Sequence, residues 1–392
     1  MRILFLSRWY PYPPDNGSKI RVFSLLRGLC ERHDVTLISF YNPDEKTPDP
    51  PLSSAAPVET RLCPYREFEP AGLRARLGYL SRTPRYLVDT HRPEMERLIR
   101  RAVSKTRYDL VIASQLSMAA YHPAFRGVPA IFEEVELGIY WPDGARHLSR
   151  LSRIRRALTW AKHRRYMSRL LDNFILCTVA SDVERRLLTA AAPHFQSVHV
   201  VPNSVDAEPV SHDTRQRIPD SLIFAGSLRY APNRDAMTWF VNEVFPVVRA
   251  KVPGARLTIT GETGPQALPP VPNVVLTGRV PDVRSLLARS AVSLAPIRVG
   301  GGTRLKILEA MAVRTPVVAT TKAMEGLEVR DGEHVLMADT PREFAEAVLQ
   351  LLRDPARARE MADRAWHLCQ TRYDSKVVIP QFLRLVERAT AA

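Results

Sequence analysis

The sequence predicts an α/β fold built from two Rossmann-like domains. Short runs rich in Val, Ile and Leu alternate with helical stretches along most of the chain. Many of these runs lack polar alternation, as expected of parallel strands that are buried on both faces. A polar segment with two prolines, 207–219, separates two series of such units. The length of 392 residues is enough for two or three domains.

The first series supplies the strands of the N-terminal domain. The candidate strands are Ile3–Ser7, Val35–Phe40, Leu110–Ser114, Ala130–Glu133, Phe174–Val179 and Val198–Val201. The segment Asn42–Pro70 is rich in Pro, Asp and Glu, so we expect a loop there. This domain is predicted to span residues 1–206.

The second series supplies the strands of the C-terminal domain, predicted at 207–375. The candidate strands are Leu222–Ala225, Arg256–Thr260, Val274–Thr277, Val292–Ala295, Pro316–Thr320 and Val335–Met337. Helical segments between most of them complete the βα units. A last helix is expected within 376–392.

The composition is that of a soluble globular protein, with 45% hydrophobic and 25% charged residues. The four cysteines are far apart and form no CxxC pair, which argues against a disulfide framework and a zinc site. No run of 18 apolar residues is present, and the apolar start of the chain is too short for a signal peptide. We therefore expect a cytoplasmic protein, or one at the inner face of the membrane.

The net charge of +15 favours anionic partners such as nucleotide phosphates, lipid headgroups or nucleic acid. Part of the excess is local, because residues 144–171 contain nine basic residues, from Arg146 to Arg169, and no acid. Leu148, Leu151 and Leu158 fall at helical spacing among them. One interpretation is an anionic membrane surface as partner. The other is an apolar stripe that packs on its own domain while the arginines face water.

A glycine-rich turn before a helix predicts an anion site in the second domain. Three glycines allow a ligand close to the backbone, and the amides of the helix that starts at Arg304 point toward it. Lys306 and Glu309 share one face of that helix. Lys306 can neutralise a phosphate, and Glu309 can accept hydrogen bonds from a ribose. The turn residues are Gly300, Gly301, Gly302 and Thr303.

Two further turns follow predicted strands and precede helices. The first has Gly17 and Ser18 at a helix N-terminus, with Arg21 one turn on. The second has Gly226 and Ser227 at the carboxyl end of a strand, where open α/β sheets bind ligands. It is followed by the cations Arg229 and Arg234 and by Asn233, whose structural alternative is to cap the next helix.

The run GGGTRLKILEAMA, followed by PVVAT, resembles the donor-site segment of retaining glycosyltransferases of family 4, which have the GT-B fold. ASDVERRL followed by VVPNSVD also resembles this family, although Ser204 replaces the usual glycine. The glycine-rich form is similar to sugar transferases of bacterial exopolysaccharide gene clusters. The resemblance implies two Rossmann-like domains facing across a cleft, with the last helix packing back on the N-terminal domain.

The resemblance also implies a metal-independent transfer from a nucleotide sugar, without a further cofactor and with an unspecified base. Lys306 and one of Arg229 and Arg234 would stabilise the leaving diphosphate. Gly17, Ser18 and Arg21 would face it from the other domain. The acceptor would be a glycan, a lipid-linked molecule or a small molecule, and no nucleic-acid partner is expected.

The chain departs from the family at two places. The first carboxylate of the family's E-x7-E pair is replaced by Gly301. The His-Asp pair of many relatives is also missing, and FEEVE stands in its place. Glu134 or Glu136 is therefore a candidate for binding a sugar hydroxyl or assisting proton transfer; the alternative is a pair of solvated carboxylates.

Two other functions are compatible with these patterns. A nucleotide-sugar epimerase or a phosphorylase with the same fold would bind a similar ligand but perform other chemistry. A basic scaffold on membrane or RNA would use only the 144–171 run and would not bind nucleotide. Fold alone does not separate these functions.

Overall fold

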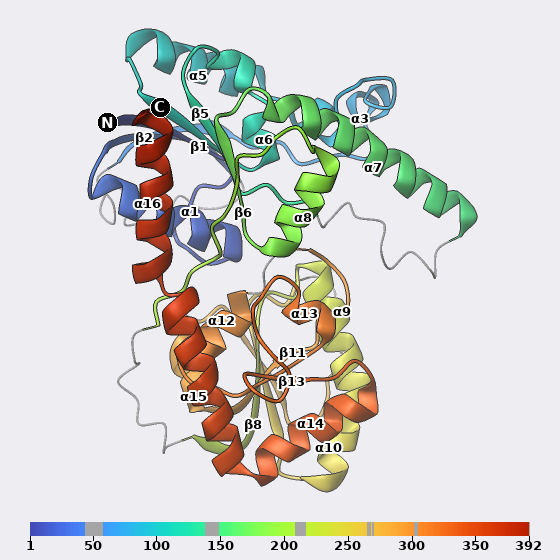
Figure 1. Cartoon of the computed structure of the whole chain (residues 1–392). Coiled ribbons are helices and arrows are strands. Elements are labelled where there is room, and N and C mark those ends of the chain that lie inside the picture. Colours follow the sequence, from blue (N-terminus) through green and yellow to red (C-terminus); the bar gives the residue numbers. More distant parts are fainter. Residues whose placement is uncertain are drawn as a thin grey trace. The chain divides into compact units, whose positions relative to one another are not determined.

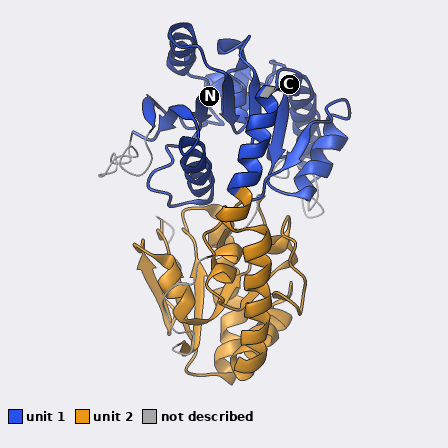
Figure 2. Ribbon diagram, turned by 60° about the vertical axis from the view of Figure 1, so that its left-hand side comes forward, with its two compact units in different colours: residues 1–202, 379–392 blue, residues 203–378 orange. Residues whose placement is uncertain are grey.

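The computed structural model describes residues 1–43, 58–137, 149–207, 217–264, 268, 270–301 and 305–391. It divides into two compact units (Figure 2). Unit 1 comprises residues 1–202 and 379–392, and unit 2 comprises residues 203–378. The chain therefore passes between the units twice.

Within the described part of unit 1, seven parallel strands form one sheet in the order β3-β2-β1-β4-β5-β6-β7. They are β1 (Arg2–Ser7), β2 (Asp34–Tyr41), β3 (Glu59–Pro64), β4 (Leu110–Ser114), β5 (Ala130–Glu133), β6 (Leu176–Val179) and β7 (Val198–Val200). Phe5 of β1 pairs with Leu37 on one side and Ile112 on the other. The four residues Ile3–Leu6 are fully buried, which explains their unbroken apolar run.

Strand β3 contradicts the prediction of a loop throughout Asn42–Pro70. It pairs in parallel with β2, with Cys63 opposite Phe40. As an edge strand it has several exposed or half-exposed residues, so its sequence, ETRLCP, lacks the apolar run of the central strands. Residues 44–57 of the predicted loop lie outside the described part.

The helices of unit 1 come between these strands in chain order and lie outside the sheet (Figure 1). They are α1 (Gly17–Cys30), α3 (Leu73–Leu77), α4 (Arg85–Thr90), α5 (Pro93–Lys105), α6 (Leu116–Ala119), η1 (His122–Ala124), α7 (Arg150–Leu171) and α8 (Asp182–Ala191). Asn16 caps α1, because its Oδ1 accepts a hydrogen bond from the backbone N–H of Lys19 at 3.1 Å.

The last helix, α16 (Ser375–Ala391), adds its residues from Ile379 onward to unit 1. It packs on α1 so closely that a Cβ at Gly28 would lie 2.2 Å from Cγ2 of Ile379. The amide of Gln381 donates to the carbonyl of Val200 at 3.0 Å. Gly28 is thus required by packing rather than by a turn.

The described part of unit 2 contains six parallel strands in the order β10-β9-β8-β11-β12-β13. They are β8 (Ile218–Ala225), β9 (Arg256–Thr260), β10 (Val274–Gly278), β11 (Ser290–Ala295), β12 (Val317–Ala319) and β13 (Leu336–Met337). The helical elements are α9 (Ala231–Trp239), η5 (Phe240–Val244), α10 (Phe245–Lys251), α11 (Val283–Arg289), α12 (Leu305–Ala312), α13 (Thr321–Met324), α14 (Pro341–Arg353) and α15 (Pro355–Arg372).

Both sheets reverse their strand order once. In unit 1 the chain adds β2 and β3 on one side of β1 and then β4 to β7 on the other. In unit 2 it adds β9 and β10 on one side of β8 and then β11 to β13 on the other. Ligands of open α/β sheets bind at such reversals, outside the carboxyl ends of the strands. The expected sites therefore lie near the ends of β1 and β4, and near the ends of β8 and β11.

Candidate functional site

At the reversal in unit 2, β8 ends at Ala225 and is followed by Gly226 and Ser227. Gly226 has a φ of +152°, which disfavours other residues. A Cβ at this position would lie 2.8 Å from Nδ2 of Asn233 and 3.0 Å from Nζ of Lys306. Because Gly226 has no side chain, Asn233 of α9 and Lys306 of α12 can lie next to the backbone at the end of β8.

Lys306 is held at this point by two contacts. Its Nζ donates to Oδ1 of Asn233 at 2.9 Å and lies 3.8 Å from the centre of the Phe224 ring. Nδ2 of Asn233 in turn donates to the carbonyl of Ser227 at 2.9 Å. The alternative that Asn233 caps a helix is wrong, because α9 begins at Ala231 and Asn233 lies inside it. Its side chain instead links the strand end to the lysine.

The glycine-rich turn lies against the start of α9. Gly300 has a φ of +99°, and a Cβ there would approach Cγ of Pro232 to 3.1 Å and the hydroxyl of Tyr230 to 3.4 Å. The described part of this turn thus meets the same helix that supplies Asn233. Gly301 is described, but the predicted ligands Gly302 and Thr303 lie outside the described residues, as does Arg304.

Glu309 lies one turn beyond Lys306 on α12 and is partly buried. Burial raises the pKa of its carboxyl above the ordinary value, and the nearby charges of Lys306 and Arg284 oppose that rise. The carboxylate and the ammonium group are therefore near one another, as their spacing predicts.

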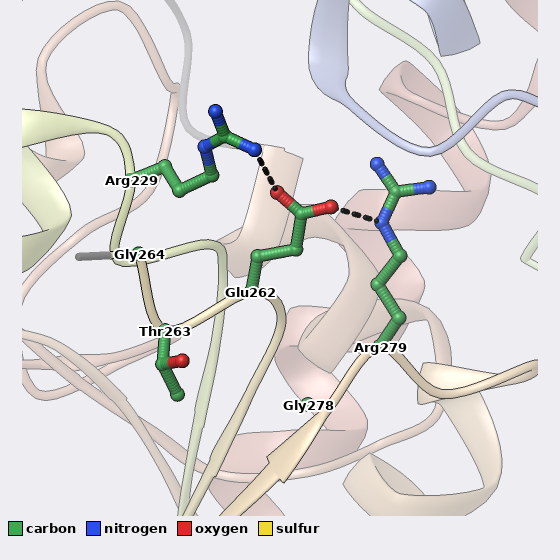
Figure 3. A pocket seen from close by; sticks show the side chains of 6 residues that line it. All are labelled: Arg229, Glu262, Thr263, Gly264, Gly278 and Arg279. Carbon is green, nitrogen blue, oxygen red and sulfur yellow. Dashed lines mark hydrogen bonds and ion pairs between the residues drawn. The ribbon is translucent and has the colours of Figure 1, made fainter. Parts of the chain in front are cut away.

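A cavity of about 620 Å³ adjoins the strand end (Figure 3). It is lined by Arg229, Glu262, Thr263, Gly264, Gly278 and Arg279. The Glu262 carboxylate lies between two guanidinium groups, at 3.3 Å from Arg229 and 2.9 Å from Arg279. The backbone N–H of Leu228 donates to the carbonyl of Glu262 at 2.7 Å, which fixes this wall of the cavity to the turn after β8.

The structure gives Arg229 and Arg234 different surroundings. Arg229 is exposed and reaches the cavity through its ion pair with Glu262. Arg234 is partly buried, and its guanidinium donates to the carbonyl of Leu228 at 3.4 Å. Arg234 therefore stabilises the turn after β8 through its hydrogen bond to the backbone, whereas the side chain of Arg229 is exposed beside the cavity.

At the reversal in unit 1, two residues that are not glycine have left-handed backbones. Gln115 follows β4 with a φ of +68°, and Glu134 follows β5 with a φ of +55°. The Gln115 amide donates to the Glu134 carboxylate at 3.0 Å and to the hydroxyl of Ser18, at the start of α1, at 3.4 Å. Non-glycine residues in such backbones cluster at functional sites. Gly17, which is exposed, and Ser18, which is partly buried, begin α1 beside this pair.

Arg21 lies behind this pair and is buried. Its Nε donates to Glu133 at 2.6 Å, and another nitrogen donates to the carbonyl of Val201 at 2.9 Å. Glu133 also accepts from the hydroxyl of Ser114 at 2.6 Å. These contacts link Arg21 of α1 to the ends of β4 and β5 and to the residue that follows β7. Arg21 therefore stabilises the arrangement of these elements around the Gln115–Glu134 pair.

Glu134 combines this strained backbone with an altered acidity. Burial, together with the neighbouring carboxylates Glu133 and Glu136, raises its pKa to about 8. Arg21 and the hydrogen bond from Gln115 act in the opposite direction. Glu134 is therefore protonated in much of the population at neutral pH. Glu136 is partly buried two residues further on.

Sequence reasoning missed Gln115, Glu262 and Arg279. The signal for the last two was present, since Gly261, Gly264 and Gly278 mark turns at the ends of β9 and β10. In the described ranges, no group of three or more His, Cys, Asp and Glu side chains could hold a metal ion.

Two family models match consecutive parts of the chain. Residues 16–204 match the model described as "Glycosyl transferase 4-like domain". Residues 219–354 match the one described as "Glycosyl transferases group 1". The first match contains the Gln115–Glu134 pair, and the second contains Gly226, Lys306 and the cavity.

Two curated proteins are similar in sequence. An uncharacterized 44.6 kDa protein in the cps region of Klebsiella pneumoniae is 25% identical over 175 residues, 42% of this chain and 45% of the relative. A phosphatidyl-myo-inositol mannosyltransferase of Mycobacterium leprae is 31% identical over 201 residues, 48% of this chain and 52% of the relative. The chain thus spans about half the length of the curated relatives it matches.

Solved structures share the fold over the whole chain. Sucrose-phosphate synthase from Thermosynechococcus elongatus has a TM-score of 0.73 at 16% identity and covers 100% of both chains. HepE from Anabaena, solved in complex with UDP-glucose, has a TM-score of 0.69 at 15% identity and covers 99% of this chain and 100% of its own. The predicted α/β class and GT-B fold are confirmed.

Proposed function

The chain belongs to the family 4-like glycosyltransferases, with a 4-like domain followed by a group 1 domain, and we propose that it moves a sugar from a nucleotide sugar to an acceptor hydroxyl. The observation that carries the proposal is Lys306, which Asn233 and Phe224 hold beside the end of β8 in the group 1 domain. The reaction is retaining and needs no divalent metal.

The arrangement around Lys306 suits a leaving diphosphate. Negative charge grows on that group as its bond to the sugar breaks, and a fixed ammonium group stabilises the charge without reorganisation. The turn of Gly300 and Gly301 brings backbone close to the same place, since Gly300 lies against Pro232 at the start of α9. Arg229, rather than Arg234, supplies a second cation from the surface of the site.

The cavity beside Arg229 suits the nucleoside part of the donor. The Glu262 carboxylate can accept hydrogen bonds from N–H or O–H groups, and the two arginines hold it at the wall of the cavity. HepE was solved with UDP-glucose, which makes a uridine nucleotide the first donor to test. A thermal-shift panel of UDP, GDP, ADP, TDP and CMP identifies the base, because a ligand at a hundred times its Kd adds about 2.7 kcal/mol to stability.

The decisive test is product analysis with and without an acceptor. We expect transfer only when an acceptor hydroxyl is present, with the anomeric configuration of the donor retained in the NMR spectrum of the product. Activity should survive EDTA. An epimerase would instead release nucleotide and a changed sugar without an acceptor. The name of the mannosyltransferase relative includes the lipid phosphatidyl-myo-inositol, so the first acceptors to test include phospholipids and polyisoprenyl lipids.

Glu309→Ala should weaken donor binding by about 1–3 kcal/mol, the cost of removing a hydrogen bond to a charged group. The carboxylate lies one turn beyond Lys306, the reach of a ribose from a diphosphate at that lysine. Isothermal titration with the matching nucleotide measures the loss. Glu346→Ala, which removes an exposed carboxylate from α14, is the control. Unchanged affinity in folded Glu309→Ala would remove Glu309 from the site.

Asn233→Ala should lower kcat about tenfold while leaving nucleotide affinity nearly unchanged. The side chain fixes Lys306 through one hydrogen bond to a charged donor, and such bonds contribute about 1.5–3 kcal/mol. Steady-state kinetics and titration together separate the two effects. Asn242→Ala, at an exposed position of η5, controls for the loss of an amide. A drop in affinity equal to the drop in kcat would mean that Asn233 contacts the donor itself.

A further inference from the structure

The most exposed apolar side chains of the described residues gather in two short segments of unit 1. Every large apolar side chain that is at least 55% exposed belongs to one of them. Segment one is α3 with the three residues that follow it, up to Leu80, and segment two is the N-terminal half of α7. The side chains are Leu73, Leu77, Tyr79 and Leu80 in the first, and Leu151, Ile154 and Leu158 in the second.

Segment one is fixed to α7 just beyond segment two, although about 70 residues separate the two segments in the chain. The ammonium group of Lys162, on α7, donates to the carbonyl of Gly78 at 2.6 Å. The rings of Tyr86, on α4, and His163, on α7, stack with their centres 5.8 Å apart and 7° between planes. Figure 1 shows α3 beside α7, whose N-terminal end extends away from the sheet.

Helix α7 is divided into two halves with different surroundings. The C-terminal half is anchored, since Met167, Leu170 and Leu171 are buried in the core of unit 1. In the N-terminal half, Leu151, Ile154 and Leu158 form one stripe at spacings of three and four. The interpretation that the predicted stripe packs on its own domain is wrong for Leu151 and Leu158, which are 80% and 67% exposed. Leu148 and Arg146 lie outside the described residues.

Both segments are strongly basic. No Asp or Glu occurs in 70–88 or in 149–171. The exposed cations are Arg76, Arg150, Arg153 and Arg155 in the two segments, Arg82 just after the first, and Arg164, Arg165 and Arg169 further along α7. A surface that presents long apolar side chains among cations suits the boundary between headgroups and acyl chains of an anionic bilayer. None of the helices in the described ranges has the length and hydropathy to span a bilayer.

We propose that the α3 region and the N-terminal half of α7 form a single docking surface for an anionic membrane. The apolar side chains enter the headgroup boundary while the arginines bind anionic headgroups. A second copy of the chain is a poor occupant, because a self-complementary interface would bring the same cations together. Nucleic acid is also a poor fit, since single-stranded binding relies on aromatic stacking and six of the seven apolar side chains are aliphatic. This surface is independent of the glycosyl transfer proposed above.

Vesicle co-sedimentation tests the proposal with two surface variants of the full chain. One variant reverses exposed charges (Arg76→Glu, Arg153→Glu, Arg155→Glu), and the other removes apolar anchors (Leu73→Gln, Leu80→Gln, Leu151→Gln). The matched control reverses three exposed charges elsewhere: Arg97→Glu, Arg330→Glu and Arg342→Glu. The vesicles contain phosphatidylcholine alone or with about one-third phosphatidylglycerol.

We expect the wild type to sediment with the anionic vesicles, not with the neutral ones, and to be released by salt. Charge reversal should weaken partitioning at least about 100-fold, since the loss of each of the three cations costs roughly a fivefold factor and each new carboxylate is repelled. The apolar variant should weaken it about tenfold at unchanged net charge. The control should match the wild type. Circular dichroism and an unchanged Tm show that each variant is folded.

Three results would overturn the proposal. The first is wild-type sedimentation of either surface variant. The second is equal weakening in the control, which would indicate net charge rather than this surface. The third is absence of vesicle binding by the wild type, combined with a different occupant of this surface. That occupant would be seen as a dimer in analytical ultracentrifugation or as RNA binding in a filter assay, and the apolar variant would abolish it. Nucleotide binding by unit 2 serves as a separate readout, so the proposed transfer reaction can fail or succeed independently.

Discussion

Replacing Lys306 with alanine is expected to lower kcat about 100-fold or more, with a smaller effect on nucleotide affinity. The ammonium group acts on charge that develops on the leaving diphosphate, so its removal raises the barrier more than it weakens the ground-state complex. Loss of one fixed donor at a site of developing charge costs about 10²–10³-fold in turnover. Steady-state kinetics with the identified donor measure the change.

The variant Lys306→Arg separates the effect of the charge from the effect of the geometry. It keeps the positive charge but does not reproduce the geometry that joins Nζ to Asn233 and to the Phe224 ring. We expect partial activity, between that of the wild type and that of Lys306→Ala. An alanine variant with wild-type kcat would show that another group stabilises the diphosphate. Loss of wild-type activity in EDTA would show that a divalent cation does so.

Replacing Glu134 with glutamine is expected to lower kcat about 100-fold and to remove a pH dependence near pH 8. Burial raises the pKa of the carboxyl to about 8, so below that pH it carries a proton and can act as a general acid, which the amide of glutamine cannot do. Wild-type activity should therefore fall as the pH rises through about 8. A pH profile of kcat/KM measures this. Glu136→Gln, which removes a charge that raises the pKa of Glu134, should keep the pH dependence but shift it to lower pH.

Stability provides a second readout for Glu134 that does not depend on catalysis. Between about pH 4.5 and about pH 8, the folded chain keeps a proton there that the unfolded chain has released. The free energy of unfolding therefore falls as the pH rises, by up to about 1.4 kcal/mol per pH unit from this group. Denaturant unfolding of Glu134→Gln should lack that slope. Identical slopes in wild type and variant, or activity that rises through pH 8, would contradict the assignment.

Much of the fold could be predicted because central parallel strands leave a strong sequence pattern. Runs such as ILFLS are apolar throughout since both faces of β1 are buried. Strand β3 has no such pattern, because it lies at an edge and partly faces solvent. The helix with Lys306 was predicted from its glycine-rich start, and the structure places it at Leu305–Ala312.

The contacts of the candidate site could not be predicted from the sequence, because they join residues that are distant in the chain and are brought together only by the fold. Gln115 and Glu134 are 19 residues apart and are brought together by the pairing of β4 with β5. Asn233 and Lys306 are 73 residues apart. A helix cap was the structural alternative for Asn233 because asparagine often caps helices, yet α9 starts two residues earlier. Whether a polar residue caps a helix or bridges two elements depends on a partner that is distant in sequence.

The passage of the chain from unit 1 to unit 2 and back has a consequence for biosynthesis. Unit 2 is continuous in sequence, whereas unit 1 needs residues 379–391, including Ile379 against Gly28, to complete its packing. During translation the ribosome releases those residues only after all of unit 2. The domain that is synthesised first is therefore finished last, and until then the nascent chain exposes the apolar side of α1 that α16 later covers.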